Sequence, residues 1–283
     1  MVASGIREDP IFVLGMGRCG STFLQHALCQ VQDVWIWGEH DEMLSKLFDW
    51  YAWVSASEGI ERSATQNARS KLIASFPYVE EADANAFAWI NGFSKHDVNA
   101  LLREIIPRLF ALNLPAGKTR WGFKEIRYNQ HNFVVDRLLE LFPLARVVYV
   151  MREPQRTIEG SLFSWHGQEI EAVIRGDAGA LDALGHAYFS RSQHWLLVAN
   201  YFIGLGERTG RVFMLPIEQF EEKREALEEF LSLKFPAELV RLTNKGSISR
   251  EDLHPVVQSV FQHAWKNTKP SIAALAQSYG YQV

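Results

Sequence analysis

A strand, a glycine-rich turn and the start of a helix follow one another without a break in residues 11–31, and this stretch most constrains the fold. Residues 11–14 form a short apolar run of the kind found in fully buried parallel strands. Glycines then stand at Gly15, Gly17 and Gly20, where they allow the backbone to turn tightly. Apolar residues recur at helical spacing beyond the turn, so free backbone N–H groups should lie at a helix N-terminus. Such an end binds anions, and we expect a phosphate-like group there.

The turn keeps the frame of a nucleotide-binding loop but changes its charge. A Walker A loop reads G-x-x-x-x-G-K-[ST], and its lysine reaches the outer phosphates. Gly15 and Gly20 keep that spacing, yet Ser21 stands where the lysine should be and Thr22 follows. Arg18 supplies a positive charge inside the loop instead. We therefore expect a phosphate cradle adapted to something other than ATP hydrolysis; the alternative is an ordinary strand-to-helix crossover with glycines for packing.

Short apolar runs alternate with helical patterns along the rest of the chain. Further strands are expected at residues 34–37, 121–125, 146–151 and 211–215, and helices at 133–142 and 218–231. This alternation predicts an α/β fold with a doubly wound, mainly parallel sheet in a single domain, residues 1–283. Residues 41–120 are mostly helical and are expected to form a cap inserted between strands. Within them Ser94 and Asp97 indicate a capping box, and Pro107 should kink or end the helix that follows.

Two candidate bases, Glu39 and His40, follow the second expected strand. Functional groups gather beyond the carboxyl ends of parallel strands, so both lie near the glycine turn if the first two strands are neighbours. We take Glu39 as the first choice for a general base and His40 as the second. The alternatives are a carboxylate that only caps a helix and a histidine with a structural role.

Composition excludes several classes of protein. The net charge of −4 argues against a nucleic-acid binder with a broad basic surface, so an anionic ligand must be held by a local cluster of cations. Two cysteines, Cys19 and Cys29, are too few for a disulfide framework, and no pattern suggests a metal site. We expect no membrane span, because no apolar run approaches about 20 residues. The first residues lack a signal-peptide pattern, so the expected location is the cytoplasm.

Three stretches together resemble the sulfotransferases that use 3′-phosphoadenosine 5′-phosphosulfate (PAPS). GRCGST resembles that family's P-loop-like phosphosulfate loop, and VVYVMREP with a later serine resembles its 3′-phosphate motif. A late Lys-Gly pair resembles more loosely the loop that closes over the same phosphate. The resemblance thus implies a set of nucleotide-binding residues, namely Gly17, Arg18, Cys19, Gly20, Ser21, Thr22, Arg152, Ser161, Lys245 and Gly246.

The resemblance implies transfer of a sulfuryl group from PAPS to a hydroxyl or amine of a small-molecule, sugar or lipid acceptor, without a metal. Arg18 and the loop amides suit the 5′-phosphosulfate, and Glu39 suits the base. Lys124, in the stretch GFKEIR, could reach the sulfuryl oxygens, with Arg127 in the pocket; a surface salt-bridge network is the alternative for this cluster. The chain departs from the family where the serine of the 3′-phosphate motif is expected, because Gly160 stands there.

Two rival functions stay open. The spacing of the glycine loop also suits a P-loop kinase or another nucleotide triphosphatase, although the loop lacks its lysine. A non-catalytic nucleotide-binding protein of the same fold is the other alternative. Neither the acceptor nor the oligomeric state can be read from the sequence.

Overall fold

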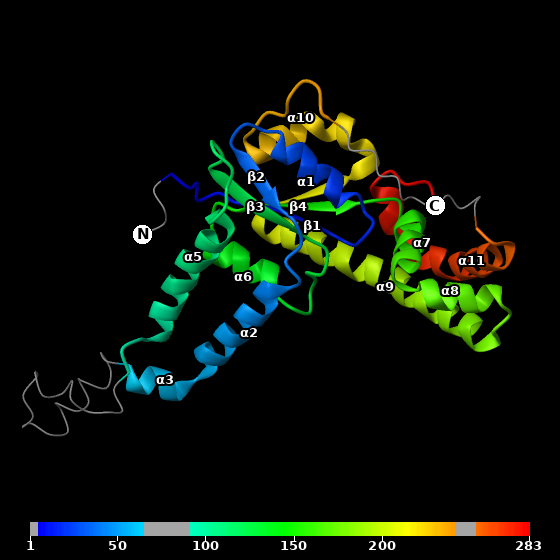
Figure 1. Ribbon diagram of the computed structural model, residues 1–283, viewed down its shortest axis with the longest axis horizontal. Coiled ribbons are helices and arrows are strands. Elements are labelled where there is room, and N and C mark those ends of the chain that lie inside the picture. The colour runs from blue at the N-terminus through cyan, green and yellow to red at the C-terminus, as the bar shows by residue number, and fades with distance from the viewer. Residues whose placement is uncertain (1–4, 65–90, 241–252) are drawn as a thin grey trace, which may run out of the picture.

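The computed structural model describes residues 5–64, 91–240 and 253–283, and its centre is a five-stranded sheet in which every strand is parallel to its neighbours (Figure 1). The strands lie in the order β2-β3-β1-β4-β5. They are β1 (Ile11–Gly15), β2 (Val34–Trp37), β3 (Arg120–Glu125), β4 (Arg146–Met151) and β5 (Val212–Pro216). All five strands expected from the sequence are confirmed, as is the parallel arrangement.

Helices cover both faces of the sheet, so the doubly wound prediction is also confirmed. Alternate residues of β1 separate two apolar layers: Ile11 and Val13 face one, Phe12 and Leu14 the other. One layer is covered by α1 (Ser21–Cys29) and α10 (Phe220–Leu231). The opposite layer lies among the remaining longer helices (Figure 1), which include α6 (Val134–Leu141), α7 (Pro154–Trp165), α8 (Gly167–Ile174), α9 (Ala178–Thr209) and α11 (Pro255–Ser278). A 3₁₀ turn at Ile217–Gln219 precedes α10, so that helix begins later than expected.

The position of β1 corrects one expectation. The first two strands are not neighbours, because β3 lies between β1 and β2. The chain leaves β1 through α1, forms β2 at the sheet edge and returns with β3 to fill the gap. Parallel strands end at a common edge, so the segments after β1, β3 and β4 meet where the strand order reverses.

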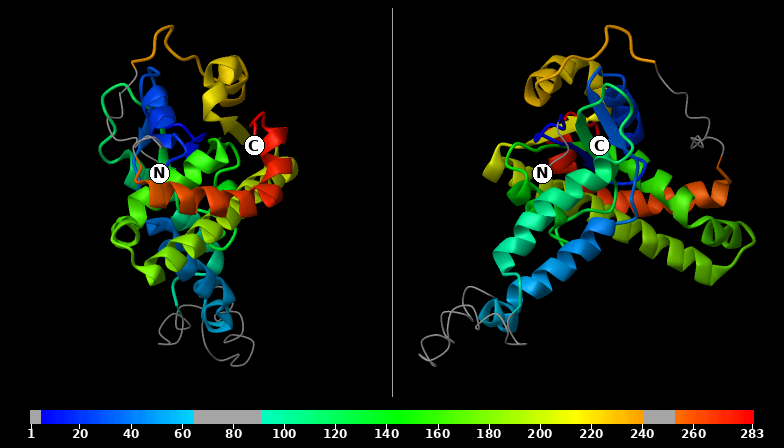
Figure 2. Two further views of the ribbon diagram at one scale, coloured as in Figure 1. Left: turned by 90° about the vertical axis from the view of Figure 1, so that its right-hand side faces the viewer. Right: turned by 60° about the vertical axis from the view of Figure 1, so that its left-hand side comes forward.

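The described helices between β2 and β3 form an arm, consisting of α2 (Met43–Ala56), α3 (Glu58–Ser63) and α5 (Lys95–Ala111). Figure 2 shows α2 and α5 side by side, extending away from the sheet, while α5 packs on β3 and α2 packs on α6 at the near end. The capping box is confirmed, since Ser94 and Asp97 each accept a hydrogen bond from the other's backbone N–H. The helix does not end at Pro107 but continues to Ala111.

Helix α9 joins the sheet to the helices at its far side. It has 32 residues, and it packs against β5 as well as against α7, α8 and α11. A helix of this length spans about 48 Å. It therefore carries side chains from the sheet past the carboxyl edge (Figure 1).

A buried arginine at the start of β3 binds the segment before β1 and the end of α10. The Arg120 side chain is 2% exposed and lies 3.1 Å from the Asp9 carboxylate. It also donates hydrogen bonds to the backbone carbonyls of Asp9 and Leu231. Burial lowers the pKa of Arg120 to about 10, although Asp9 opposes this shift. The charge is thus compensated within the protein rather than by water.

We expect Arg120→Met to lower the free energy of unfolding by about 3 kcal/mol, because it leaves two backbone carbonyls, those of Asp9 and Leu231, without their donor and removes one of the two arginines that pair with Asp9. Urea-induced unfolding measures this loss. Arg137→Met is the matched control: Arg137 pairs with Glu140 on the surface of α6, and its loss should change stability by less than about 0.5 kcal/mol. Equal effects of the two substitutions would contradict the structural role of Arg120.

Candidate active site

The glycine loop between β1 and α1 presents backbone donors at a helix end. Arg18 and Gly20 both have positive φ, 70° and 91°, and this conformation turns the loop sharply before α1. Helix α1 begins at Ser21 with Gly20 as its N-cap, and no side chain caps it. A Cβ at Gly20 would lie 2.9 Å from Cγ1 of Ile217, so both space and backbone conformation favour glycine. The loop thus has the sharp turn and uncapped helix start that suit an anion, and anion binding there stays a prediction.

Cys19 supports this loop from beneath. Its side chain is buried, and its N–H donates to the Met16 carbonyl at 3.3 Å. Burial raises the pKa of the Cys19 thiol, although hydrogen bonding by Ser21 and the charge of Lys124 oppose the shift. Lys124 lies opposite Val13 in the paired strands β3 and β1, close to the start of the loop. Cys19 is thus a buried part of the turn that is hydrogen-bonded to Met16 through its backbone.

Two arginines, Arg18 and Arg152, approach each other at α7. Arg18 is exposed, and its side chain lies over Gly160, where an added Cβ would be 3.4 Å from the Arg18 Cβ. Arg152 follows β4 and donates from Nη1 to the Arg18 carbonyl at 3.4 Å. Its Nε lies 3.8 Å from Oε1 of Glu218. Glu218 is a partner that sequence reasoning missed, since nothing in its local pattern links it to β4.

Ser161 is turned away from these arginines. Its side chain is buried, and its hydroxyl donates to the Ile158 carbonyl at 2.7 Å within α7. A helix rotates about 100° per residue, so the shift from position 160 to position 161 changes the side on which the hydroxyl lies. Gly160 faces Arg18 in its place. The remaining predicted nucleotide-binding residues, Lys245 and Gly246, lie outside the described residues.

Glu39 is held by cations from β3 and the segment after it. Lys124 forms an ion pair with Glu39 Oε1, and Arg127 Nη1 lies 3.1 Å from Glu39 Oε2. Arg127 also pairs with Glu125 at 2.9 Å. The cluster is thus a salt-bridge network that lies only partly at the surface, because the Lys124 side chain is 8% exposed and that of Glu125 is fully buried, whereas that of Arg127 is 37% exposed. Glu39 and Lys124 lie together because β2 and β3 are paired, with Trp37 opposite Phe123.

Glu125 anchors the turn between β2 and α2. It accepts hydrogen bonds from the backbone N–H groups of Ile126, His40 and Glu42. Burial alone would raise its pKa, but the N–H groups of Ile126 and His40, together with Arg127, outweigh burial and lower the pKa of Glu125. The charged carboxylate holds this turn, in which Glu42 has a positive φ of 56°.

His40 lies among aromatic side chains beside Glu125. Its Nε2 is 2.6 Å from the Tyr128 hydroxyl, and its Nδ1 is 3.8 Å from Oε2 of Glu125. Its ring packs edge-on against Phe110 and Phe123. Burial lowers the pKa of His40 more than the Glu125 charge raises it, so the imidazole is neutral at neutral pH. These contacts favour the structural role for His40 over a role as base.

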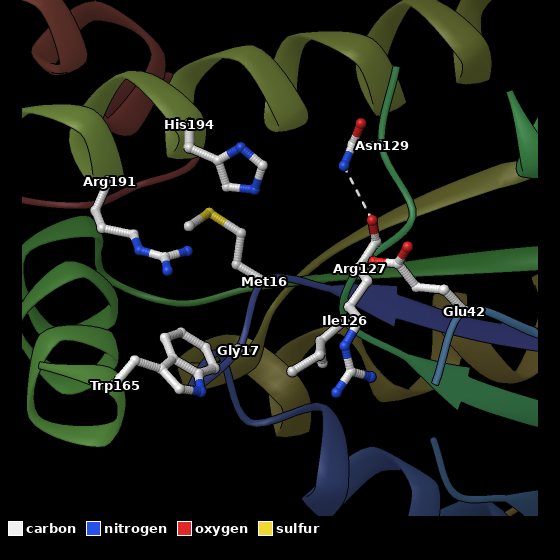
Figure 3. Close-up of a pocket in the computed structure, with 9 residues that line it drawn as sticks. All are labelled: Met16, Gly17, Glu42, Ile126, Arg127, Asn129, Trp165, Arg191 and His194. Carbon is white, nitrogen blue, oxygen red and sulfur yellow. Dashed lines mark hydrogen bonds between the residues drawn. The ribbon is translucent and has the colours of Figure 1, made fainter. Parts of the chain in front are cut away.

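A pocket of about 310 Å³ opens beside the glycine loop (Figure 3). Five segments form its walls: the loop after β1, the start of the arm, the segment after β3, the end of α7 and the middle of α9. In that order, the lining residues are Met16 and Gly17, then Glu42, then Ile126, Arg127 and Asn129, then Trp165, and finally Arg191 and His194. A Cβ at Gly17 would lie 2.2 Å from the Trp165 ring, so this glycine allows the ring to close on the loop. Glu39 is linked to the pocket indirectly, because its carboxylate accepts a hydrogen bond from Arg127, which lines the pocket.

Sequence reasoning missed Trp165, Arg191 and His194. They lie on helices without a recognisable motif, and their spacing in the sequence gives no sign that they meet. The position of Trp165 shortly after the 3′-phosphate motif is the one local signal that could have drawn attention to it.

Two further features of the described residues bear on function. No group of three or more His, Cys, Asp or Glu side chains in residues 5–64, 91–240 and 253–283 is arranged to hold a metal ion. Within those same ranges, no helix has both the length and the apolar character needed to cross a bilayer.

The pKa shifts of His40 and Glu125 predict a loss of stability in acid. The folded chain disfavours protonated His40, so the unfolded chain binds more protons as the pH falls below about 6.5. Glu125 adds a further loss of folding stability at lower pH, because its pKa in the folded chain is lowered. Unfolding in urea should therefore need less denaturant at pH 5.5 than at pH 7.5, and His40→Gln should reduce this difference. His186→Gln, at a side chain 79% exposed, should leave the difference unchanged; an unaltered pH dependence in His40→Gln would contradict the assignment.

Comparisons with known proteins agree with this geometry. A family model described as "Sulfotransferase family" matches residues 10–226. The fold is similar to that of the sulfotransferase domain of the olefin synthase from Synechococcus PCC 7002, with a TM-score of 0.51 and 16% identity over 100% of this chain and 99% of that one. A sulfotransferase domain from the curacin biosynthetic pathway has a TM-score of 0.50 and 16% identity, over 98% of this chain and 99% of that one. A search of curated proteins found no significant match. With more than half of its length matched by the family model, the chain belongs to the sulfotransferase family.

Proposed function

We propose that this protein transfers the sulfuryl group of PAPS to a hydroxyl or amine of a small-molecule, sugar or lipid acceptor, and leaves adenosine 3′,5′-bisphosphate. The observation that carries the proposal is the uncapped start of α1, with Arg18 and Arg152 on one side of the glycine loop and the Lys124–Glu39 pair on the other. Both cysteines are free thiols, which suits a reaction in the reducing cytoplasm.

The donor is strongly anionic, and the cations around the loop suit its two ends. In this proposal the N–H groups at the start of α1 bind the 5′-phosphosulfate, and Arg18 neutralises charge that develops on the leaving phosphate. Arg152 binds the 3′-phosphate and must exchange Glu218 for it. Charge-assisted hydrogen bonds contribute about 1.5 to 3 kcal/mol each, so a few of them suffice for micromolar binding.

Glu39 is the proposed base. The acceptor oxygen or nitrogen attacks sulfur, the bond from sulfur to the 5′-phosphate oxygen breaks, and the acceptor proton passes to Glu39. Lys124 pairs with Glu39 in the ligand-free protein. We infer that sulfuryl oxygens take over Lys124 when the donor binds, and that this frees Glu39 to accept a proton.

The P-loop kinase or nucleotide triphosphatase is the second candidate, because Gly15 and Gly20 keep the frame of a triphosphate loop. Calorimetric titration with adenosine 3′,5′-bisphosphate, beside ADP and ATP with magnesium, separates the two functions. Binding of the bisphosphate in preference to ATP supports the sulfotransferase. Preference for ATP would overturn it.

The same titration tests Arg152. We expect Arg152→Ala to weaken binding of adenosine 3′,5′-bisphosphate by about 10- to 100-fold, because one charge-assisted contact is lost. Binding of adenosine 5′-phosphosulfate, which lacks the 3′-phosphate, should change by less than about 3-fold. Arg208→Ala, an equal change of charge at a position 61% exposed on α9, is the control and should leave both affinities unaltered. Equal losses on both nucleotides would place Arg152 elsewhere in the mechanism.

Glu39→Gln should reduce turnover of radiolabelled PAPS by at least about 100-fold, because it removes the proton acceptor. The affinity for adenosine 3′,5′-bisphosphate should stay within a few-fold of the parent, since Glu39 does not face the proposed phosphate contacts. Glu58→Gln removes one carboxylate from exposed helix α3 and serves as the control for net charge. Turnover retained by Glu39→Gln would remove this residue from the mechanism.

A further inference from the structure

The wall of the pocket opposite the sheet carries a cation with no role in the proposed sulfuryl transfer. Figure 3 shows Arg191 and His194 descending from α9 on one side, with Trp165 near them at the end of α7. Arg127 and Glu42 lie together on the other side of the same view. All five residues line the pocket.

Arg191 is stacked on an aromatic ring. Its guanidinium carbon lies 4.8 Å from the centre of the Trp165 ring, a cation–π distance at which the ring restrains the position of the group. Trp165 is itself held in place, because its ring closes on Gly17. Stacking occupies the face of a guanidinium and leaves its N–H edge available for hydrogen bonds. The Arg191 edge is thus oriented before any ligand arrives.

No carboxylate in the described part of the chain lies within ion-pair distance of Arg191, and no hydrogen bond joins its guanidinium to those residues. Burial lowers the pKa of Arg191, yet a guanidinium keeps its proton at neutral pH. A partly buried charge without a partner is costly for a protein to keep. This cost is understandable if a ligand supplies the missing anion.

Arg127, the other cation in the pocket, is in a different position. Its guanidinium contacts Glu39, Glu125 and Asp41 at 3.1, 2.9 and 3.8 Å. Its charge is therefore balanced within the protein. Glu42, the acidic side chain among the lining residues, lies beside Arg127 and away from Arg191 in Figure 3. The two ends of the pocket thus differ in the charge that they offer to a ligand.

Arg191 is also separated from the proposed 3′-phosphate contact at Arg152, although its pocket borders the glycine loop at Gly17. Arg152 stands just before the start of α7, whereas Trp165 is its last residue. The helix has 12 residues and so is about 18 Å long. Arg18 lies over Gly160, partway along the helix. Arg191 is consequently placed toward the acceptor rather than toward the 3′-phosphate.

His194 adds polarity next to Arg191 without adding charge. Burial lowers its pKa, and the neighbouring charges of Arg191 and His131 lower it further. A neutral imidazole can donate one hydrogen bond and accept another. The Arg191 end of the pocket therefore offers one fixed positive charge with a neutral hydrogen-bonding group beside it.

We propose that Arg191, positioned by Trp165, binds an oxyanion of the acceptor. The acceptor is then a hydroxy or amino compound that carries a carboxylate or phosphate at a distance from the group that receives the sulfuryl. This inference rests on the proposed function for the sulfuryl transfer, but the anion site itself does not. A volume of about 310 Å³, equal to about ten water molecules, sets the size of the part that enters the pocket.

The test uses matched probes whose binding does not depend on turnover. Calorimetry on the full chain saturated with adenosine 3′,5′-bisphosphate compares 4-hydroxyphenylacetate with 4-hydroxyphenylacetamide, and tyrosol phosphate with tyrosol. Each pair differs in the anion alone. We expect the acid of each pair to bind at least about tenfold more tightly than its neutral partner. The pair with the larger ratio of affinities shows whether the site prefers a carboxylate or a phosphate.

Arg191→Met should reduce the acid preference to within about twofold, since it keeps a long side chain but loses the charge. Arg191→Lys should keep an intermediate preference, because it retains the charge without the stacked planar group. Arg175→Met, at a side chain 70% exposed near the end of α8, is the matched control and should keep the full preference. Circular dichroism verifies that each variant is folded.

Three outcomes would overturn the proposal: equal or undetectable binding of acid and neutral probes by the parent chain, equal loss of preference in Arg175→Met, or an equal loss of bisphosphate affinity in Arg191→Met. Repeating the titrations without bisphosphate separates this proposal from the proposed function. If the nucleotide does not bind at all, the donor assignment fails, and the acid preference of the pocket is still measured.

Discussion

The candidate functional groups that follow β1, β3 and β4 depend on the position of β1 in the middle of a parallel sheet. Parallel strands end at one edge, and β1 lies where the strand order reverses, so the segments that follow β1, β3 and β4 meet there. The glycine loop, Lys124 and Arg152 come together for this reason, although more than 130 residues separate the first from the last. Buried contacts such as Arg120 with Asp9 hold the neighbouring strands and loops in register with it.

Three cations of the candidate site, unlike Arg191, are balanced by acids within the described part of the protein. Arg152 faces Glu218, Lys124 faces Glu39, and Arg127 faces both Glu39 and Glu125. A protein of net charge −4 can keep these cations close together because each one has an acid beside it. An incoming anion must then compete with these acids, and the affinity for a ligand reflects the difference between two sets of ion pairs rather than the strength of one.

The sequence predicts the strands and the glycine loop well because these features are local. Apolar runs such as residues 146–151 admit few interpretations, and a glycine turn before a helix has a definite conformation. Strand order is not local: nothing near residues 34–37 states that β3 will separate them from β1. The orientation of Ser161 depends on a one-residue shift within α7, and Arg191 joins the pocket only through the packing of α9 on α7. Such features arise from tertiary packing, which a single sequence does not reveal.

The length of α9 has a consequence for how such a protein can change. The proposed donor contacts lie on loops at the sheet edge, whereas the Arg191 wall of the pocket belongs to one continuous helix that is anchored on β5 and the α7–α8–α11 group. Side chains on that helix can be exchanged without moving the loops. Variation along α9 therefore offers a route to new acceptors in which the proposed donor site is inherited intact.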